Sequence, residues 1–189
     1  MGAYIVGNDL AQKDKEERER QISLVKHGVE RASQLKTDIL RVFAGNPKPD
    51  FPNYQAAKDI LVSSFKEVSS FAKGRGITLA LENHGQLCAR TDEILDLLNE
   101  VDSPSLRLNL DIANFLEVGE DPVSSVRKLA HLAVHTHIKD FKKVDGKVIP
   151  TLVGEGDIDL EGCLKTLKEK NYQGYLSLEY EAEVDSKVG

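Results

Sequence analysis

Four short apolar runs in this sequence each end in a residue that can bind a metal ion or carry a proton. These residues are Glu82, Asp111, His137 and Glu179. Two glutamates, an aspartate and a histidine form a mixed oxygen and nitrogen donor set, which suits divalent ions such as Mn²⁺, Mg²⁺, Co²⁺ or Zn²⁺. Taken singly, each is compatible with a hydrogen-bonded polar cap on a strand. Their repetition at four strand ends indicates a metal or acid–base site.

The runs that precede these residues are typical of buried parallel strands, which are nearly continuous in apolar residues. Between them lie longer segments whose apolar residues recur every three or four positions, as in amphipathic helices. The expected strands cover residues 3–6, 39–43, 77–81, 106–110, 132–138 and 175–178, and the expected helices cover 13–35, 54–73, 91–101, 122–130 and 160–167. Alternation of this kind predicts a parallel sheet covered by helices.

An open sheet and a barrel both satisfy this alternation. A dinucleotide-binding open sheet would need a glycine-rich fingerprint after its first strand, and Gly7-Asn8-Asp9 does not supply one. A barrel places functional groups at the carboxyl ends of several strands, as here. The sequence therefore predicts one incomplete (β/α) TIM barrel over residues 1–189, with about six parallel strands instead of the eight of a full barrel.

The fifth expected strand carries two histidines, which share one face and differ in their position along the strand. His135, His137 and Lys139 share one face, because side chains two residues apart point the same way. His135 lies deeper in the strand, so we expect it to support the site or the core. The segment after this strand, residues 141–157, is expected to be a loop, with a turn at Asp145-Gly146 and a natural position for substrate contacts.

The composition of the chain limits the classes of partner that we expect it to bind. The net charge is −6, and no dense basic patch suggests a nucleic-acid surface. No apolar run reaches the ~20 residues of a membrane span. Cys88 and Cys163 lack a metal-binding spacing and are expected to be buried reduced thiols, which favours a cytoplasmic protein. A small-molecule substrate, with neither nucleic acid nor membrane as partner, is the expectation.

At these residues the chain resembles the sugar phosphate isomerase/epimerase family, within the xylose-isomerase-like TIM barrels. Six stretches carry the resemblance and occur in family order. They are residues 40–45 (LRVFAG), 81–84 (LENH), 109–114 (NLDIAN), 135–140 (HTHIKD), 153–159 (VGEGDID) and 178–180 (LEY). Together they are specific for the superfamily and only weakly specific for a substrate.

The resemblance implies one divalent ion bound by Glu82, Asp111, His137 and Glu179. It also implies that Glu82 and Glu179 exchange a proton with the substrate carbon through an enediolate, whose charge the ion stabilises. Further residues implied to contact substrate oxygens are His84, Asn114, Lys139, Arg41 and Glu155. The expected activity is isomerisation or epimerisation of a small sugar, sugar phosphate or keto-polyol.

Three alternatives stay open. A keto-sugar dehydratase or lyase could use the same ion and base. The related AP endonucleases share the barrel, but the net charge of −6 disfavours DNA binding. An inactive metal-binding remnant is the third, because alignment by the six stretches leaves the first barrel unit and the eighth strand without counterparts. Two unpaired sheet edges would result, so we expect copies of the chain to associate into a homo-oligomer.

Overall fold

A computed structural model describes residues 3–182, with side chains from residue 6 onward, and divides the chain into two compact units. Unit 1 ends at Asn109 and unit 2 begins at Leu110, so the boundary falls within one continuous strand, β4. Unit 1 contains β1 (Ala3–Ile5), α1 (Lys15–Gln34), β2 (Ile39–Val42), α2 (Tyr54–Lys73), β3 (Thr78–Glu82), α3 (Thr91–Val101) and the first part of β4 (Leu106–Asp111).

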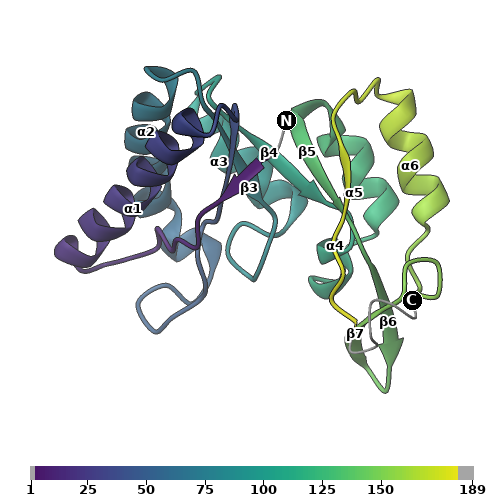
Figure 1. The fold of residues 1–189 in the computed structure, drawn as a ribbon. Helices are drawn as coiled ribbons and strands as arrows, with labels where there is room; N and C mark the ends of the chain where they lie inside the picture. Colours follow the sequence, from purple (N-terminus) through teal and green to yellow (C-terminus); the bar gives the residue numbers. More distant parts are fainter. Residues whose placement is uncertain (1–2, 183–189) are drawn as a thin grey trace. The chain divides into compact units, whose positions relative to one another are not determined.

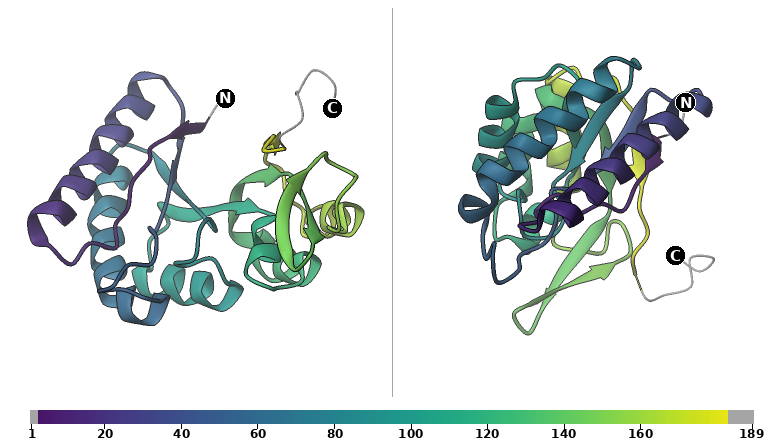
Figure 2. Two further views of the ribbon diagram at one scale, coloured as in Figure 1. Left: turned by 90° about the horizontal axis from the view of Figure 1, so that it is seen from below. Right: turned by 90° about the vertical axis from the view of Figure 1, so that its left-hand side faces the viewer.

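The strands of unit 1 are parallel and follow the chain in the order β1-β2-β3-β4. Helices α1, α2 and α3 lie side by side against the sheet (Figures 1 and 2). The packing follows the apolar period of α2, whose buried face contains Ala57, Leu61, Phe65, Val68 and Ala72. The Asn53 side chain caps this helix by accepting from the Ala56 N–H at 3.0 Å. Its predicted end at residue 73 is confirmed, and Gly74 follows as the C-cap residue.

Unit 2 continues the same alternation. It contains α4 (Asn114–Glu117), α5 (Pro122–Leu129), the 3₁₀ helix η1 (Ala130–Leu132), β5 (Ala133–Ile138), β6 (Asp140–Val144), β7 (Lys147–Thr151), α6 (Leu160–Glu169) and β8 (Leu176–Leu178). Strand β5 lies next to the end of β4, and β8 pairs with β5 in parallel. Helix α5 begins as predicted, because Asp121 accepts from the Ser124 N–H and Pro122 occupies the first helical position.

Six parallel strands with intervening helices, among residues 3–182, confirm the predicted incomplete (β/α) barrel. Within the same residues, no helix combines the length and the apolar character that crossing a membrane requires. Both cysteines are buried free thiols, as expected.

One local prediction was wrong, and one short helix was not expected. The expected loop 141–157 contains an antiparallel hairpin, β6–β7, which extends beyond β5 (Figure 1). Its two-residue turn, Asp145-Gly146, has φ of +50° and +77°, the backbone that matches the twist of paired strands. Helix α3 covers the expected residues, and Arg90 is the residue that precedes its first turn. The short helix α4 was not expected, because it has only one turn.

Candidate metal centre

Three of the four predicted ligands lie in unit 2, at neighbouring strand ends. Asp111 ends β4, His137 is near the end of β5, and Glu179 directly follows β8. Two backbone hydrogen bonds set this alignment, from Ile112 N–H to the His137 carbonyl at 3.2 Å and from Glu179 N–H to the Ile138 carbonyl at 3.0 Å. The parallel register thus brings the three side chains to one edge of the sheet.

The ligand atoms of this cluster are close together. The His137 Nδ1 atom lies 3.3 Å from Glu179 Oε2 and 3.8 Å from Asp111 Oδ2. One ligand atom of each of the three residues lies within 4.8 Å of the others. Ligand atoms around an ion with bonds of about 2.0–2.2 Å lie roughly 3–3.5 Å apart. Asp111 and His137 are buried and Glu179 is partly buried, so the donor chemistry and spacing fit a divalent ion.

The orientation of Asp111 comes from the start of the following helix. Its Oδ1 atom accepts from the backbone N–H groups of Ala113, at 2.9 Å, and Asn114, at 3.2 Å. This arrangement directs Oδ2 toward His137 and Lys139. Asn114 is the first residue of α4, and its side chain is buried. The backbone N–H of Asn114 makes the contact with Asp111. A helix of one turn is sufficient to fix this carboxylate.

Lys139 lies between the carboxylates of the cluster. Its Nζ atom is 3.1 Å from Asp111 Oδ2 and 3.0 Å from Glu179 Oε2, and it also donates to Glu181 Oε1 at 3.0 Å. Burial lowers the pKa of Lys139, but the charges of Asp111 and Glu179, together with hydrogen bonds to Glu181 and Glu179, raise it above the ordinary value. The sequence predicted a substrate contact here, and the structure adds an ion pair with two candidate ligands.

The protonation of Glu179 follows from the same contacts. Its hydrogen bond with His137 lowers its pKa, burial opposes this effect, and the charge of Lys139 lowers the pKa further. Together these effects place the pKa of Glu179 well below its ordinary value, so the carboxylate is ionised and can bind a cation. His135, on the same face of β5, contacts Ser177 Oγ through Nε2 at 2.8 Å. That contact agrees with the supporting role expected of His135.

The fourth predicted ligand, Glu82, ends β3 in unit 1. It is fully buried, and its Oε2 atom forms an ion pair with Arg41 Nη1 at 2.8 Å. The Arg41 guanidinium also lies over the Phe43 ring, 4.9 Å from the centroid. The exposed His84 ring meets Phe43 edge to face at 5.2 Å. Arg41 and His84, both predicted substrate contacts, thus belong to one group of side chains with Glu82.

The last predicted site residue, Glu155, is exposed in the loop after β7. The buried carboxylate of Asp140 holds this loop by accepting from the N–H groups of Gly154 at 2.9 Å and Gly156 at 3.0 Å. It also accepts from Phe141 N–H at 2.9 Å. Sequence reasoning missed Asp140, although two glycines around Glu155 were a signal for a tightly held turn.

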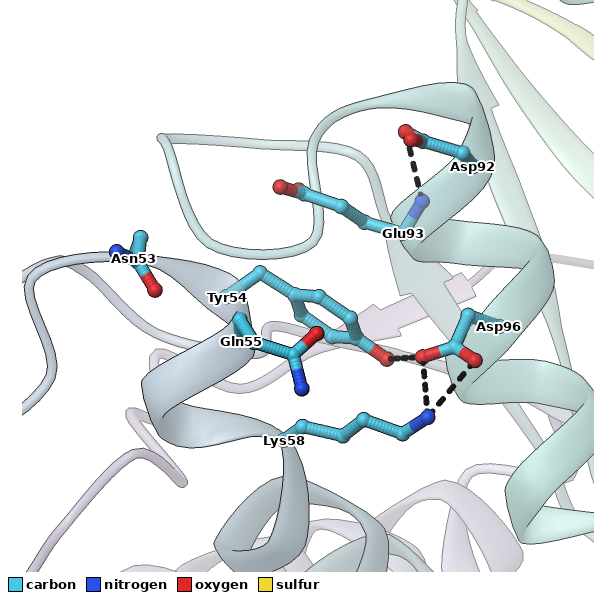
Figure 3. Close-up of a pocket in the computed structure, with 7 residues that line it drawn as sticks. All are labelled: Asn53, Tyr54, Gln55, Lys58, Asp92, Glu93 and Asp96. Carbon is cyan, nitrogen blue, oxygen red and sulfur yellow. Dashed lines mark hydrogen bonds and ion pairs between the residues drawn. The ribbon is translucent and has the colours of Figure 1, made fainter.

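A separate hollow of unit 1 lies between the first turns of α2 and α3, and none of its lining residues is a predicted site residue. Figure 3 shows its lining of Asn53, Tyr54, Gln55, Lys58, Asp92, Glu93 and Asp96. Its polar groups bind one another. Asp96 accepts from Tyr54 Oη at 2.7 Å and from Lys58 Nζ at 2.8 Å, and Asp92 accepts from the Glu93 N–H. Glu93 caps α3 by accepting from the N–H groups of Ala89 and Arg90.

Comparison with known proteins agrees with the fold described above. Residues 2–188 match the family model described as xylose isomerase-like TIM barrel. The chain belongs to this family. The match covers nearly the whole chain, and therefore both units.

Several individual proteins are similar to this chain in sequence or in structure. An inosose dehydratase from Clostridium perfringens is 28% identical over 137 residues, which are 64% of this chain and 46% of that protein. The chain thus spans about half the length of the curated relatives it matches. A solved D-tagatose 3-epimerase-like protein has a TM-score of 0.82 at 24% identity, covering 94% of this chain and 70% of that one. The IOLI protein, solved with a zinc atom, has a TM-score of 0.79 at 22% identity, covering 94% and 65%.

Proposed function

We propose that this chain carries the catalytic centre of a metal-dependent isomerase or epimerase acting on a small sugar, sugar phosphate or keto-polyol. The observation that carries the proposal is the cluster of Asp111, His137 and Glu179, whose donor atoms are spaced as ligands of one ion. Relatives that are named as epimerases and dehydratases, and a similar fold solved with zinc, support it.

Glu82 is proposed as the fourth ligand from strand register. Glu82 on β3 pairs with Asn109 on β4. Asp111 is two residues further along the same strand, and side chains two residues apart on a strand point the same way. The carboxylates of Glu82 and Asp111 are therefore expected on one face, at the carboxyl ends of adjacent strands.

A bound divalent ion would polarise a substrate carbonyl and stabilise the negative charge that develops on its oxygen. The protein's own groups then move the proton. One of Glu82 and Glu179, as a carboxylate, would remove the proton from the carbon next to the carbonyl, and the other, as a protonated carboxyl group, would return a proton. Return to the opposite face of that carbon gives an epimer, and return to the neighbouring carbon gives an isomer. Arg41 forms an ion pair with Glu82 and Lys139 with Glu179, so a cation lies beside each proposed proton carrier.

A dehydratase is the second candidate, because an inosose dehydratase is among the sequence relatives. It would begin with the same proton removal, after which a hydroxyl on the next carbon leaves as water. The 189-residue chain, loaded with Mn²⁺ or Zn²⁺, should be incubated with ketoses and cyclic keto-polyols in D₂O. Deuterium at carbon in a product of unchanged composition supports the isomerase, and loss of water supports the dehydratase. Absence of both reactions with the metal bound would contradict the proposal and leave a metal-binding remnant.

A further inference from the structure

A small hollow in unit 1 shares Phe43 and His84 with the group of side chains around Glu82. It has a volume of about 130 Å³ and is lined by Asn8, Phe43, Gly45, Asn46 and His84. These residues follow the carboxyl ends of β1, β2 and β3, and Glu82 ends β3 at the same edge of the sheet. The hollow therefore lies where a barrel enzyme binds its substrate.

The wall of the hollow is built by specific contacts. The buried Asn8 side chain donates to the Phe43 carbonyl at 2.7 Å and accepts from the Phe43 N–H at 3.1 Å. These bonds hold the segment after β1 against the end of β2. Gly85, at φ +76°, lets the chain pass Asn46 closely, since a Cβ there would lie 2.7 Å from Asn46 Oδ1. The rings of Phe43 and His84 form the adjoining wall.

One arginine connects the hollow to the proposed proton carrier. Arg41 forms the ion pair with Glu82 and also lies over the ring of Phe43. A molecule that rests on the exposed part of Phe43 is thus one side chain away from Glu82. All of these contacts lie within unit 1.

The side chains that line the hollow favour an uncharged substrate group over a charged one. Amides and an imidazole both donate and accept hydrogen bonds, as hydroxyl groups do, and the Phe43 ring suits the C–H bonds of a carbon chain. The lining includes no lysine or arginine. The nearby cations are engaged, Arg41 with Glu82 and Lys48 with Asp9 at 2.8 Å. A phosphate, with a charge of about −1.5 to −2, would therefore enter without a cation of its own.

We propose that this hollow is a subsite for the uncharged, hydroxyl-bearing end of the substrate, which is therefore an unphosphorylated polyhydroxy ketone or aldehyde. The proposal rests on the proposed function and narrows its substrate class. The volume matches about four water molecules at ~30 Å³ each, enough for a two-carbon diol. Asn46 and His84 are the hydrogen-bonding groups, and Phe43 is the apolar contact.

Binding to the metal-loaded 189-residue chain tests the subsite without requiring turnover. The probes are D-fructose and D-fructose 6-phosphate, followed by NMR of the Asn46 amide and the His84 ring. We expect the free sugar to shift both signals and to bind at least as tightly as the phosphate. Tighter binding of the phosphate, or unshifted Asn46 and His84 signals on sugar binding, would overturn the subsite.

A charge substitution gives the sharper result. Asn46→Lys should reverse the preference and strengthen phosphate binding roughly tenfold or more, as expected for a hydrogen bond to a charged group. Ser63→Lys adds the same charge at an exposed site on α2 and should change neither affinity. Equal effects of the two variants would overturn the subsite. If sugars turn over but Asn46→Lys changes nothing, only the subsite fails; if neither sugar nor metal binds, the proposed function fails with it.

Discussion

Two clusters in this chain have nearly the same composition, a lysine between two carboxylates, and differ in what surrounds them. In unit 2, Lys139 bridges Asp111 and Glu179. In unit 1, Lys58 bridges Asp96 and Glu100 beside Tyr54 (Figure 3 shows all of these except Glu100). The side chains of Lys139 and Asp111 are 3% and 0% exposed, whereas those of Lys58 and Asp96 are 21% and 39% exposed.

The difference in burial between the two clusters changes how strongly their charges interact. Charges in the interior interact strongly because water screens them little, whereas exposed pairs are screened and contribute little to stability. The buried cluster also includes the imidazole of His137, which completes a donor set for a metal. The exposed cluster contains a phenol, whose hydrogen bond to Asp96 satisfies that carboxylate. A lysine–carboxylate group becomes a candidate site only when burial and a further ligand accompany it.

The largest effect is expected for Glu179→Gln. An amide retains the shape of the side chain but cannot accept the substrate proton, so proton exchange should fall by ~10²–10⁴-fold. The matched control is Glu181→Gln, which also removes a carboxylate that contacts Lys139. Deuterium incorporation and metal content should be measured together, because an amide is also a weaker ligand. Equal losses in the two variants would remove Glu179 from the proton-transfer step.

Lys139→Met should strongly destabilise the chain without metal. Removing the ammonium leaves two partly or fully buried carboxylates uncompensated, and breaking a buried ion pair typically costs ~3–5 kcal/mol. A divalent ion should restore part of this loss, because it binds only the folded state. Urea denaturation with and without chelator measures both effects. Lys58→Met, the counterpart in the exposed cluster, should leave the midpoint nearly unchanged. Equal destabilisation of the two variants would contradict the role assigned to burial.

Asp140→Asn should loosen the loop that carries Glu155. The amide of asparagine has one acceptor oxygen, so it can accept either from Gly154 and Gly156 or from Phe141, and its NH₂ group faces the remaining donor; we expect a loss of about 1–3 kcal/mol. Hydrogen exchange at the Gly154 and Gly156 amides should accelerate, while metal content stays unchanged. Unchanged protection of both amides would show that the loop does not depend on this carboxylate.

The smallest effect concerns the acid titration of the exposed cluster. Hydrogen bonds from Lys58 and Tyr54 lower the pKa of Asp96 below its ordinary value of 3.8. A carboxyl group whose folded-state pKa is lowered stabilises the fold above its unfolded pKa and loses this effect as pH falls through the folded pKa. Lys58→Met should therefore move the pKa of Asp96 toward the ordinary value, as measured by NMR titration. A pKa that does not move would show that Lys58 is not bound to Asp96 in solution.

Local patterns in the sequence were enough to predict much of this fold. The apolar period of α2 predicted its range, residues 54–73, because the burial of one helix face depends on residues that are near neighbours in the chain. Apolar runs ending in polar residues located the strand ends that carry Glu82, Asp111, His137 and Glu179. The hairpin β6–β7 was missed even though its Asp145-Gly146 turn was recognised, because its exposed strands lack the apolar alternation of a buried sheet.

Contacts between residues far apart in the chain were decided only by tertiary structure. The sequence contains no signal that Lys139 would lie between Asp111 and Glu179, because that position depends on the register between β5 and β8. Likewise Asn8, Phe43, Asn46 and His84 come from three separate loops, and parallel pairing of β1, β2 and β3 brings those loops together. The sequence by itself determined which residue types stand at the strand ends. Which of them touch, and how far each is removed from water, depended on strand register and packing over tens of residues.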